Sequence, residues 1–255
     1  MRRKAFTLVE LMTVVAILAI LYAVLMPVVI QVKCYAQQWV AGEAIAKVGQ
    51  ATSLYMMDSD QTYPLAYYST GDGRRQNWFG IVAADGSVDP ATSLLKPYIK
   101  GKIQRDYALN ALPWDGDDSG YGYNWGYLGS DYYQPTSWSD SQNCVNPASD
   151  SSLGDTSSTV EFATTSFFYA TWMPKGDGQT YRYGFADPPD VWFGNPTVDF
   201  RHMAIKTIDK KAHEVKSTGL AIILFSDDHV KPLHQKDVTQ KMFERNNGLG
   251  ATLEP

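Results

Sequence analysis

The first thirty residues hold the longest apolar segment of this chain. Twenty consecutive residues, from position 11 to position 30, carry no formal charge. As an α-helix with a rise of 1.5 Å per residue, such a segment extends about 30 Å, which matches the thickness of the hydrocarbon core of a bilayer. The pattern therefore predicts a helix that spans a membrane.

The charges that precede this segment predict its orientation. Arg2, Arg3 and Lys4 come before it, and positive residues beside a first membrane helix stay on the cytoplasmic side. We therefore expect a single pass with a cytoplasmic N-terminus and the rest of the chain across the membrane. A cleaved secretory signal peptide is disfavoured, because its apolar region would be shorter and would end in a small-x-small site.

Glu10 is the one charged residue between Lys4 and position 30. A carboxylate near the start of a membrane helix is costly unless it has a partner. A plain membrane anchor does not account for such a residue. Glu10 is therefore a candidate functional residue.

A second apolar pattern predicts that the helix continues beyond the bilayer. Small and apolar residues recur at helical spacing and form one face that would pack on a sheet: Ala41, Ala44, Ile45, Val48, Ala51 and Tyr55. Gly42 and Gly49 weaken this helix without ending it. The polar cluster at 58–61, followed by Pro64, predicts its end, so one helix of about fifty residues would be about 75 Å long.

The rest of the chain shows the patterns of an antiparallel sheet. Residues 221–225 are apolar on both faces, as in a central strand covered by the helix, and 229–233 is predicted as its shorter edge partner. Further strands are predicted at 159–162, 166–173 and 180–185. The expected fold class is α+β, with a long N-terminal helix packed on an antiparallel sheet that carries long loops.

The order of the N-terminal features resembles the class III leader of type IV pilins and type II secretion pseudopilins. Three basic residues lead into the sequence Ala5, Phe6, Thr7, Leu8, Val9, Glu10 and then into the apolar helix. The resemblance implies that a prepilin peptidase cleaves between Ala5 and Phe6 and that the new N-terminal amine is methylated. The family usually has Gly before the cut; this chain has Ala5, which is also small.

The same resemblance implies assembly into a helical filament. The apolar helices leave the lipid and pack against each other, while Glu10 pairs with the amine at Phe6 of a neighbouring subunit. Thr7 belongs to the same assembly segment, as does Pro27, which weakens the helix locally. The implied partners are copies of this chain or other pilins, the prepilin peptidase, the inner-membrane assembly machinery, and membrane lipid before assembly.

These features divide the chain into four segments. We expect a basic leader at 1–5, a transmembrane and filament-core helix at 6–30, its amphipathic continuation at 31–60, and a globular pilin-like domain at 61–255. The implied location is the inner membrane, followed by a periplasmic or cell-surface filament. The formal charge of -5 argues against nucleic acid as a partner.

Later segments are similar to those of large pseudopilin-like proteins, at 54–64, 94–101 and 120–124. The C-terminal His-x9-Asp-Gly motif of those proteins is degenerate here. Arg201 and His202 match its start, an insertion follows, and Asp227 and Asp228 take the place of its Asp-Gly, before His229. Because Asp tolerates left-handed backbone better than most residues, we still expect a hairpin turn there.

One loop carries the first half of a calcium-binding pattern. Asp115, Asp117 and Ser119 hold oxygen ligands at positions one, three and five, and a glycine follows at six. Position twelve is also a glycine, so Asp131 would have to close the site. The pattern therefore favours a solvated acidic turn over a calcium site. Some pseudopilins bind Ca²⁺ in their globular loops, so the resemblance keeps this ion as the one candidate cofactor.

No enzymatic activity is predicted. The four histidines lack metal-ligand spacing, and the chain has no nucleophile elbow, phosphate-binding loop or dinucleotide fingerprint. The spacing of Cys34 and Cys144 does not indicate a disulfide. Two functions remain: a subunit of a pilus or secretion pseudopilus, and a membrane-tethered domain that binds a ligand, sugar or Ca²⁺ without polymerising. The leader and Glu10 favour the filament subunit.

Overall fold

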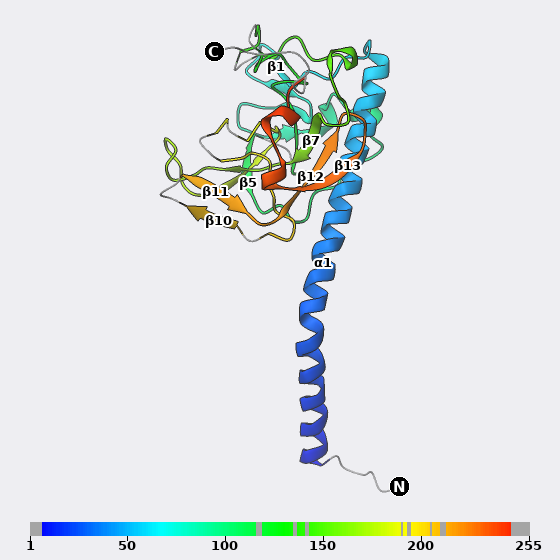
Figure 1. Cartoon of the computed structure of the whole chain (residues 1–255), viewed down its shortest axis with the longest axis vertical. Helices are drawn as coiled ribbons and strands as arrows, with labels where there is room; N and C mark the ends of the chain where they lie inside the picture. Colours follow the sequence, from blue (N-terminus) through cyan, green and yellow to red (C-terminus); the bar gives the residue numbers. More distant parts are fainter. Residues whose placement is uncertain are drawn as a thin grey trace.

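The structure is a computed structural model, and it describes residues 7–115, 119–134, 137–140, 143–189, 191–192, 195–204, 206–209 and 213–245. One long helix, α1 (Leu8–Asp58), runs the length of the molecule. Its first half stands clear of all other elements, and its second half lies along one side of a β-rich domain (Figure 1). This arrangement confirms the predicted α+β, pilin-like fold.

Helix α1 contains 51 residues and passes through Pro27 without interruption. It is the one helix in the described ranges that is long and apolar enough to cross a membrane. Its end confirms the predicted stop: Asp60 and Gln61 have φ values of 51° and 57°, and the Gln61 N–H donates to the Met56 carbonyl at 2.9 Å.

The predicted packing face of α1 is buried from Ala41 to Ala51, and Tyr55 is half-buried. Gly49 lies within this face, where the helix packs closely against Leu224 and Asp228. A Cβ atom built on Gly49 would lie 2.6 Å from Leu224 Cδ2 and 3.0 Å from Asp228 Oδ1. Gly49 weakens the isolated helix, but its lack of a side chain allows α1 to pack this closely on the globular domain.

The central sheet has four antiparallel strands in the order β13 (Val230–His234), β12 (Leu220–Phe225), β7 (Val160–Thr164) and β6 (Tyr121–Tyr123). The predicted central strand and its edge partner are both confirmed. Ile222 and Leu224 of β12 pack toward α1, whereas Ala221, Ile223 and Phe225 belong to a second cluster, with Phe200 and Phe243. Burial on both faces explains why this strand is apolar throughout.

The β12–β13 hairpin confirms the expected turn. Asp228 takes the left-handed conformation with φ 69°, its N–H donates to the Phe225 carbonyl at 2.9 Å, and the Phe225 N–H donates to the His229 carbonyl at 3.0 Å. The Ser53 hydroxyl donates to Asp228 Oδ2 at 2.9 Å, which ties the turn to α1.

Three smaller sheets complete the described domain. One is a meander of β1 (Tyr67–Ser69), β2 (Arg75–Asn77), β3 (Gly80–Val82) and β4 (Val88–Asp89). The second has the order β5 (Leu112–Asp115), β9 (Thr180–Tyr183) and β8 (Phe167–Phe168), with β5 and β9 parallel. The third is the hairpin of β10 (Lys206–Asp209) and β11 (Glu214–Ser217).

Two predicted strands are shorter than expected. The strand expected over 166–173 ends at Phe168, because the chain turns where the Met173 N–H donates to the Ala170 carbonyl at 2.9 Å. The strand expected over 180–185 ends at Tyr183; Phe185 then forms a single parallel bridge to Tyr123.

The core between α1 and the central sheet contains a buried carboxyl group. Glu161 of β7 is 2% exposed, and its Oε1 atom has no hydrogen-bond partner among the described residues. Burial raises the pKa of Glu161 well above its usual value, the nearby Asp228 raises it further, and the Thr52 hydroxyl acts in the opposite direction. The folded domain therefore favours the neutral acid.

We expect the Glu161→Gln variant to be more stable than the wild type at pH 7, by about 1–3 kcal/mol. Folding raises the pKa of Glu161, so the free energy of unfolding is highest below the unfolded pKa near 4.5, where the group is neutral in both states. It falls as the pH rises toward the folded pKa, because the unfolded chain ionises first. Gln cannot ionise, so the variant does not lose stability in this pH range. Urea unfolding of both proteins between pH 4 and 9 measures the difference, and parallel pH curves would contradict the assignment.

Candidate functional site

The first turn of α1 is closed by the side chains of Thr7 and Glu10. Thr7 is the N-cap residue, with φ -80° and ψ 151°. Glu10 Oε2 accepts hydrogen bonds from the Thr7 N–H at 2.9 Å and the Thr7 hydroxyl at 2.8 Å, and the Glu10 N–H donates to Thr7 Oγ1 at 3.3 Å. This reciprocal capping box, Thr-x-x-Glu, satisfies backbone donors that a helix start leaves unpaired.

The capping box fixes where the carboxylate lies. Glu10 is exposed in the single subunit, at the outer surface of the first helical turn. A negative charge is favoured at a helix N-terminus because of the helix dipole. Ala5 and Phe6 lie outside the described residues, so the cleavage site and the Phe6 amine stay predictions.

The surface beyond Glu10 is apolar on every side of the helix. Large apolar side chains between Leu8 and Val32 are exposed all along this segment, for example Leu18, Ile20 and Leu21. An apolar surface of this length needs lipid or other helices to cover it. At Pro27 the ring removes one backbone donor, so the helix has one hydrogen bond fewer inside this segment.

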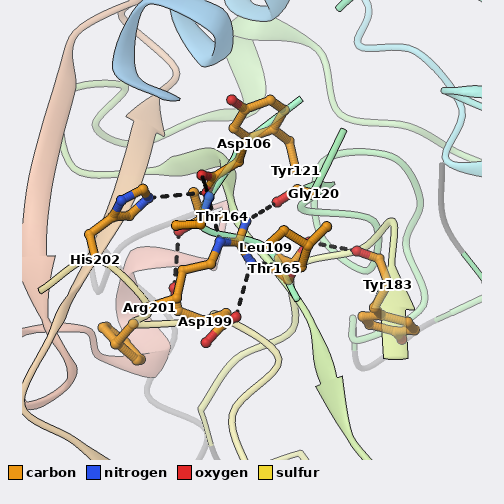
Figure 2. A network of polar contacts seen from close by, with 12 residues as sticks. Asp106, Leu109, Gly120, Tyr121, Thr164, Thr165, Tyr183, Asp199, Arg201 and His202 are labelled. Carbon is orange, nitrogen blue, oxygen red and sulfur yellow. Dashed lines mark hydrogen bonds and ion pairs between the residues drawn. The ribbon is translucent and has the colours of Figure 1, made fainter. Parts of the chain in front are cut away.

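A second group of predicted residues lies inside the globular domain, where Arg201 is the centre of a buried polar network (Figure 2). Its Nε donates to Asp106 Oδ2 at 2.6 Å, and its Nη1 donates to Asp199 Oδ2 at 3.0 Å. The same guanidinium donates to the carbonyls of Thr165 at 3.0 Å and Gly120 at 2.5 Å. The Arg201 side chain therefore joins its own segment to three others, at Asp106, at Gly120 and at Thr165, the residue that follows β7.

His202 lies on the other side of the same carboxylate. Its Nε2 is 3.1 Å from Asp106 Oδ2, and the side chains of Asp106, Arg201 and His202 are all buried. Burial by itself would raise the pKa of Asp106, but His202 and Arg201 hold it well below its usual range. The Asp106 carboxylate is therefore ionised, and its charge is balanced within the core.

The two halves of the degenerate motif lie at opposite ends of β12. His202 exchanges backbone hydrogen bonds with Leu220, the first residue of the strand. Asp227, Asp228 and His229 form the turn after its last residue, where His229 Nδ1 lies 2.5 Å from Asp227 Oδ1. The motif thus holds β12 in place at both ends, and its residues do not form one site.

The predicted calcium ligands are only partly described. Asp117 and the Asp115 side chain lie outside the described residues, and Ser119 lies beside Asp106, whose N–H donates to the Ser119 carbonyl at 2.9 Å. Asp131 instead holds its own loop: it accepts hydrogen bonds from the N–H groups of Trp138 and Ser139 and from the Asn146 amide. No group of three or more candidate metal ligands occurs in the described ranges, and calcium binding stays a prediction.

Sequence reasoning missed Asp106, Asp199 and Glu161. Asp106 lies in a connection without periodic pattern, and its partner Arg201 is 95 residues away along the chain. Asp199 is two residues before Arg201 and carries no signal of burial. For Glu161 the signal was available, because it lies between Val160 and Phe162 in a segment predicted as a strand, and a charge inside a buried strand is rare.

Comparison with known proteins identifies one segment. Residues 1–26 match the family model described as the prokaryotic N-terminal methylation motif. No curated protein and no solved structure matches the chain. The matched segment contains Thr7 and Glu10 together with most of the exposed apolar surface of α1.

Proposed function

We propose that this chain, which carries the N-terminal methylation motif and long apolar helix that together are the signature of type IV pilins and pseudopilins, is a structural subunit of a type IV pilus or a type II secretion pseudopilus. In this proposal the prepilin peptidase cleaves before Phe6, and the subunit waits in the inner membrane with its N-terminus on the cytoplasmic side. It then assembles with copies of itself or other pilins through α1. No enzymatic activity forms part of the proposal.

The observation that supports this function best is the free first half of α1. The globular domain covers the helix only from about Ala41 onward, while Glu10 stands at the other end of the exposed apolar surface. A plain anchor needs the apolar surface alone. A filament subunit needs both the apolar surface and a carboxylate that specifies how neighbours align.

The proposed assembly exchanges one apolar environment for another. In the filament the helices keep low-dielectric surroundings and gain dispersion contacts with each other. Glu10 then pairs with the Phe6 amine of a neighbour, and a buried carboxylate without a partner is strongly penalised, so this pair selects the correct register. Head-to-tail contacts of this kind do not close and therefore give a filament.

Electron microscopy of sheared cell-surface and envelope material, with gold-labelled antibodies against the globular domain, tests this function. We expect the label to follow filaments, either surface pili or the short pseudopili formed when a secretion system is overproduced. Label confined to single particles in membrane fractions would favour a tethered domain that does not polymerise.

Processing gives a separate prediction. N-terminal sequencing of the mature protein from native cells should begin at Phe6 with a methylated amine. In a strain without prepilin peptidase the same protein should keep Met1 and still fractionate with the inner membrane, because the helix remains apolar. A mature chain that starts after position 30 would mean that the segment is a removed signal sequence and would refute the assigned cleavage site.

A further inference from the structure

The globular domain contains a surface cavity that the filament function does not use. The cavity has a volume of about 690 Å³ and lies between the β4 segment and the 3-10 helices that follow it on one side and β5 and β9 on the other. Pockets for small organic ligands have volumes of about 300–1,000 Å³. The cavity is therefore large enough for part of an extended ligand.

Trp114 of β5 forms a rigid aromatic wall of this cavity. Its side chain is 46% exposed, although four aromatic residues hold it in position. The ring centroid lies 4.9 Å from that of Phe167 and 6.0 Å from that of Tyr181, and the rings of Tyr169 and Tyr183 lie at 6.4 and 5.9 Å, with interplanar angles of 6° and 24°. A large indole surface thus stays exposed at a fixed orientation.

The polar lining of the cavity contains both donors and acceptors. Lys96, Lys102, Arg105 and Arg182 supply positive groups, Asp89 supplies a carboxylate, and Ser87, Ser93 and Ser119 add hydroxyl groups. A pyranose ring matches such a lining, because it has an apolar face of C–H groups that stacks on indole and a rim of hydroxyls that both donate and accept hydrogen bonds. We propose that this cavity binds a saccharide chain, with one sugar ring stacked on Trp114.

A purely apolar ligand fits these observations less well, because it would exclude water from charged side chains of the lining such as Lys102 and Asp89, and moving charged groups out of water is costly. The proposal does not depend on filament formation, but many identical sites along one filament would increase the avidity for a polysaccharide surface.

Binding can be measured with the full chain in phospholipid nanodiscs, by isothermal titration calorimetry with cellohexaose, maltohexaose, chitohexaose and mannohexaose. We expect at least one hexasaccharide to bind with a Kd of about 1 mM or lower. Replacement of Trp114 by Ala should raise that Kd by about tenfold or more. Trp138→Ala is the matched control, since Trp138 is 81% exposed on a different loop, and it should leave the Kd unchanged.

A second variant tests whether binding needs the space of the cavity as well as stacking on Trp114. Ala91 lines the cavity and is exposed, so Ala91→Trp should fill the space and weaken binding while Trp114 stays in place. Circular dichroism confirms that each variant is folded. The proposal is overturned if none of the four probes binds at 10 mM, if Trp114→Ala and Trp138→Ala have equal effects, or if Ala91→Trp binds as well as the wild type.

Discussion

Replacement of Glu10 by Ala is expected to abolish filaments while the globular domain stays folded. The carboxylate lies at the first turn of α1, far from the contacts between this helix and the β-domain, which begin near Ala41. In the proposed filament its loss would leave the Phe6 amine of each neighbour without a partner in an apolar environment, and unpaired buried charges reduce association by about two orders of magnitude or more. Counting filaments by electron microscopy, at equal subunit levels in the membrane, measures the effect.

Two further variants distinguish the role of the Glu10 charge from its role in capping the helix. Glu10→Gln keeps the length of the side chain and a capping-box residue at this position but removes the charge, so we expect it to lose filaments as Ala does. Thr7→Val removes the hydroxyl that caps the helix and keeps the carboxylate, so filaments should persist at reduced yield. Normal filaments with Glu10→Gln would contradict the proposed ion pair and would assign the residue to capping.

The second large effect is expected for Arg201→Ala, which should lower the free energy of unfolding of the domain by about 3–5 kcal/mol. The substitution leaves the carboxylates of Asp106 and Asp199 buried without their cation, and it removes donors from the carbonyls of Thr165 and Gly120. Arg201→Lys should rescue little of this loss, since an ammonium group cannot reproduce the planar fork of the guanidinium. Chemical unfolding in detergent, followed by tryptophan fluorescence, gives the values.

Arg74→Ala is the matched control for this prediction. Arg74 also pairs with an aspartate, with 2.5 Å between its Nη2 and Asp72 Oδ2, but both side chains are about half exposed. Exposed ion pairs contribute little to stability, so the unfolding midpoint should not change measurably. If Arg74→Ala and Arg201→Ala shift the midpoint equally, the buried network does not stabilise the domain in the way described above.

The elements with a regular pattern of apolar residues along the sequence were predictable. Helix α1 has a long uncharged segment, then a stripe of small residues at helical spacing, then a polar stop with Pro64, and each feature appears where it was expected. The strand at Leu220–Phe225 was predictable for a similar reason, because only a strand buried on both faces is apolar at every position.

The parts that depend on distant contacts were not predictable. The parallel pairing of β5 with β9 joins short strands about seventy residues apart, and a strand as short as β8 has no readable alternation. The site around Arg201 shows the same limit: a family resemblance pointed to Arg201 and His202, but Asp106 comes from a loop whose burial depends entirely on tertiary packing. Glycine at position 49 is unfavourable for an isolated helix, and its reason lies in a tertiary contact, the close approach of Leu224.

In the proposed function the exposed half of α1 is covered first by lipid and then by the same helix of neighbouring subunits. Cryo-electron microscopy of filaments that contain this chain would show directly what covers it. We expect a core of bundled helices over residues 8–40, β-domains on the outside, and the Glu10 carboxylate beside the N-terminal amine of an adjacent Phe6. Filaments with this helix on the outside, or with Glu10 facing solvent away from every amine, would contradict the proposed assembly.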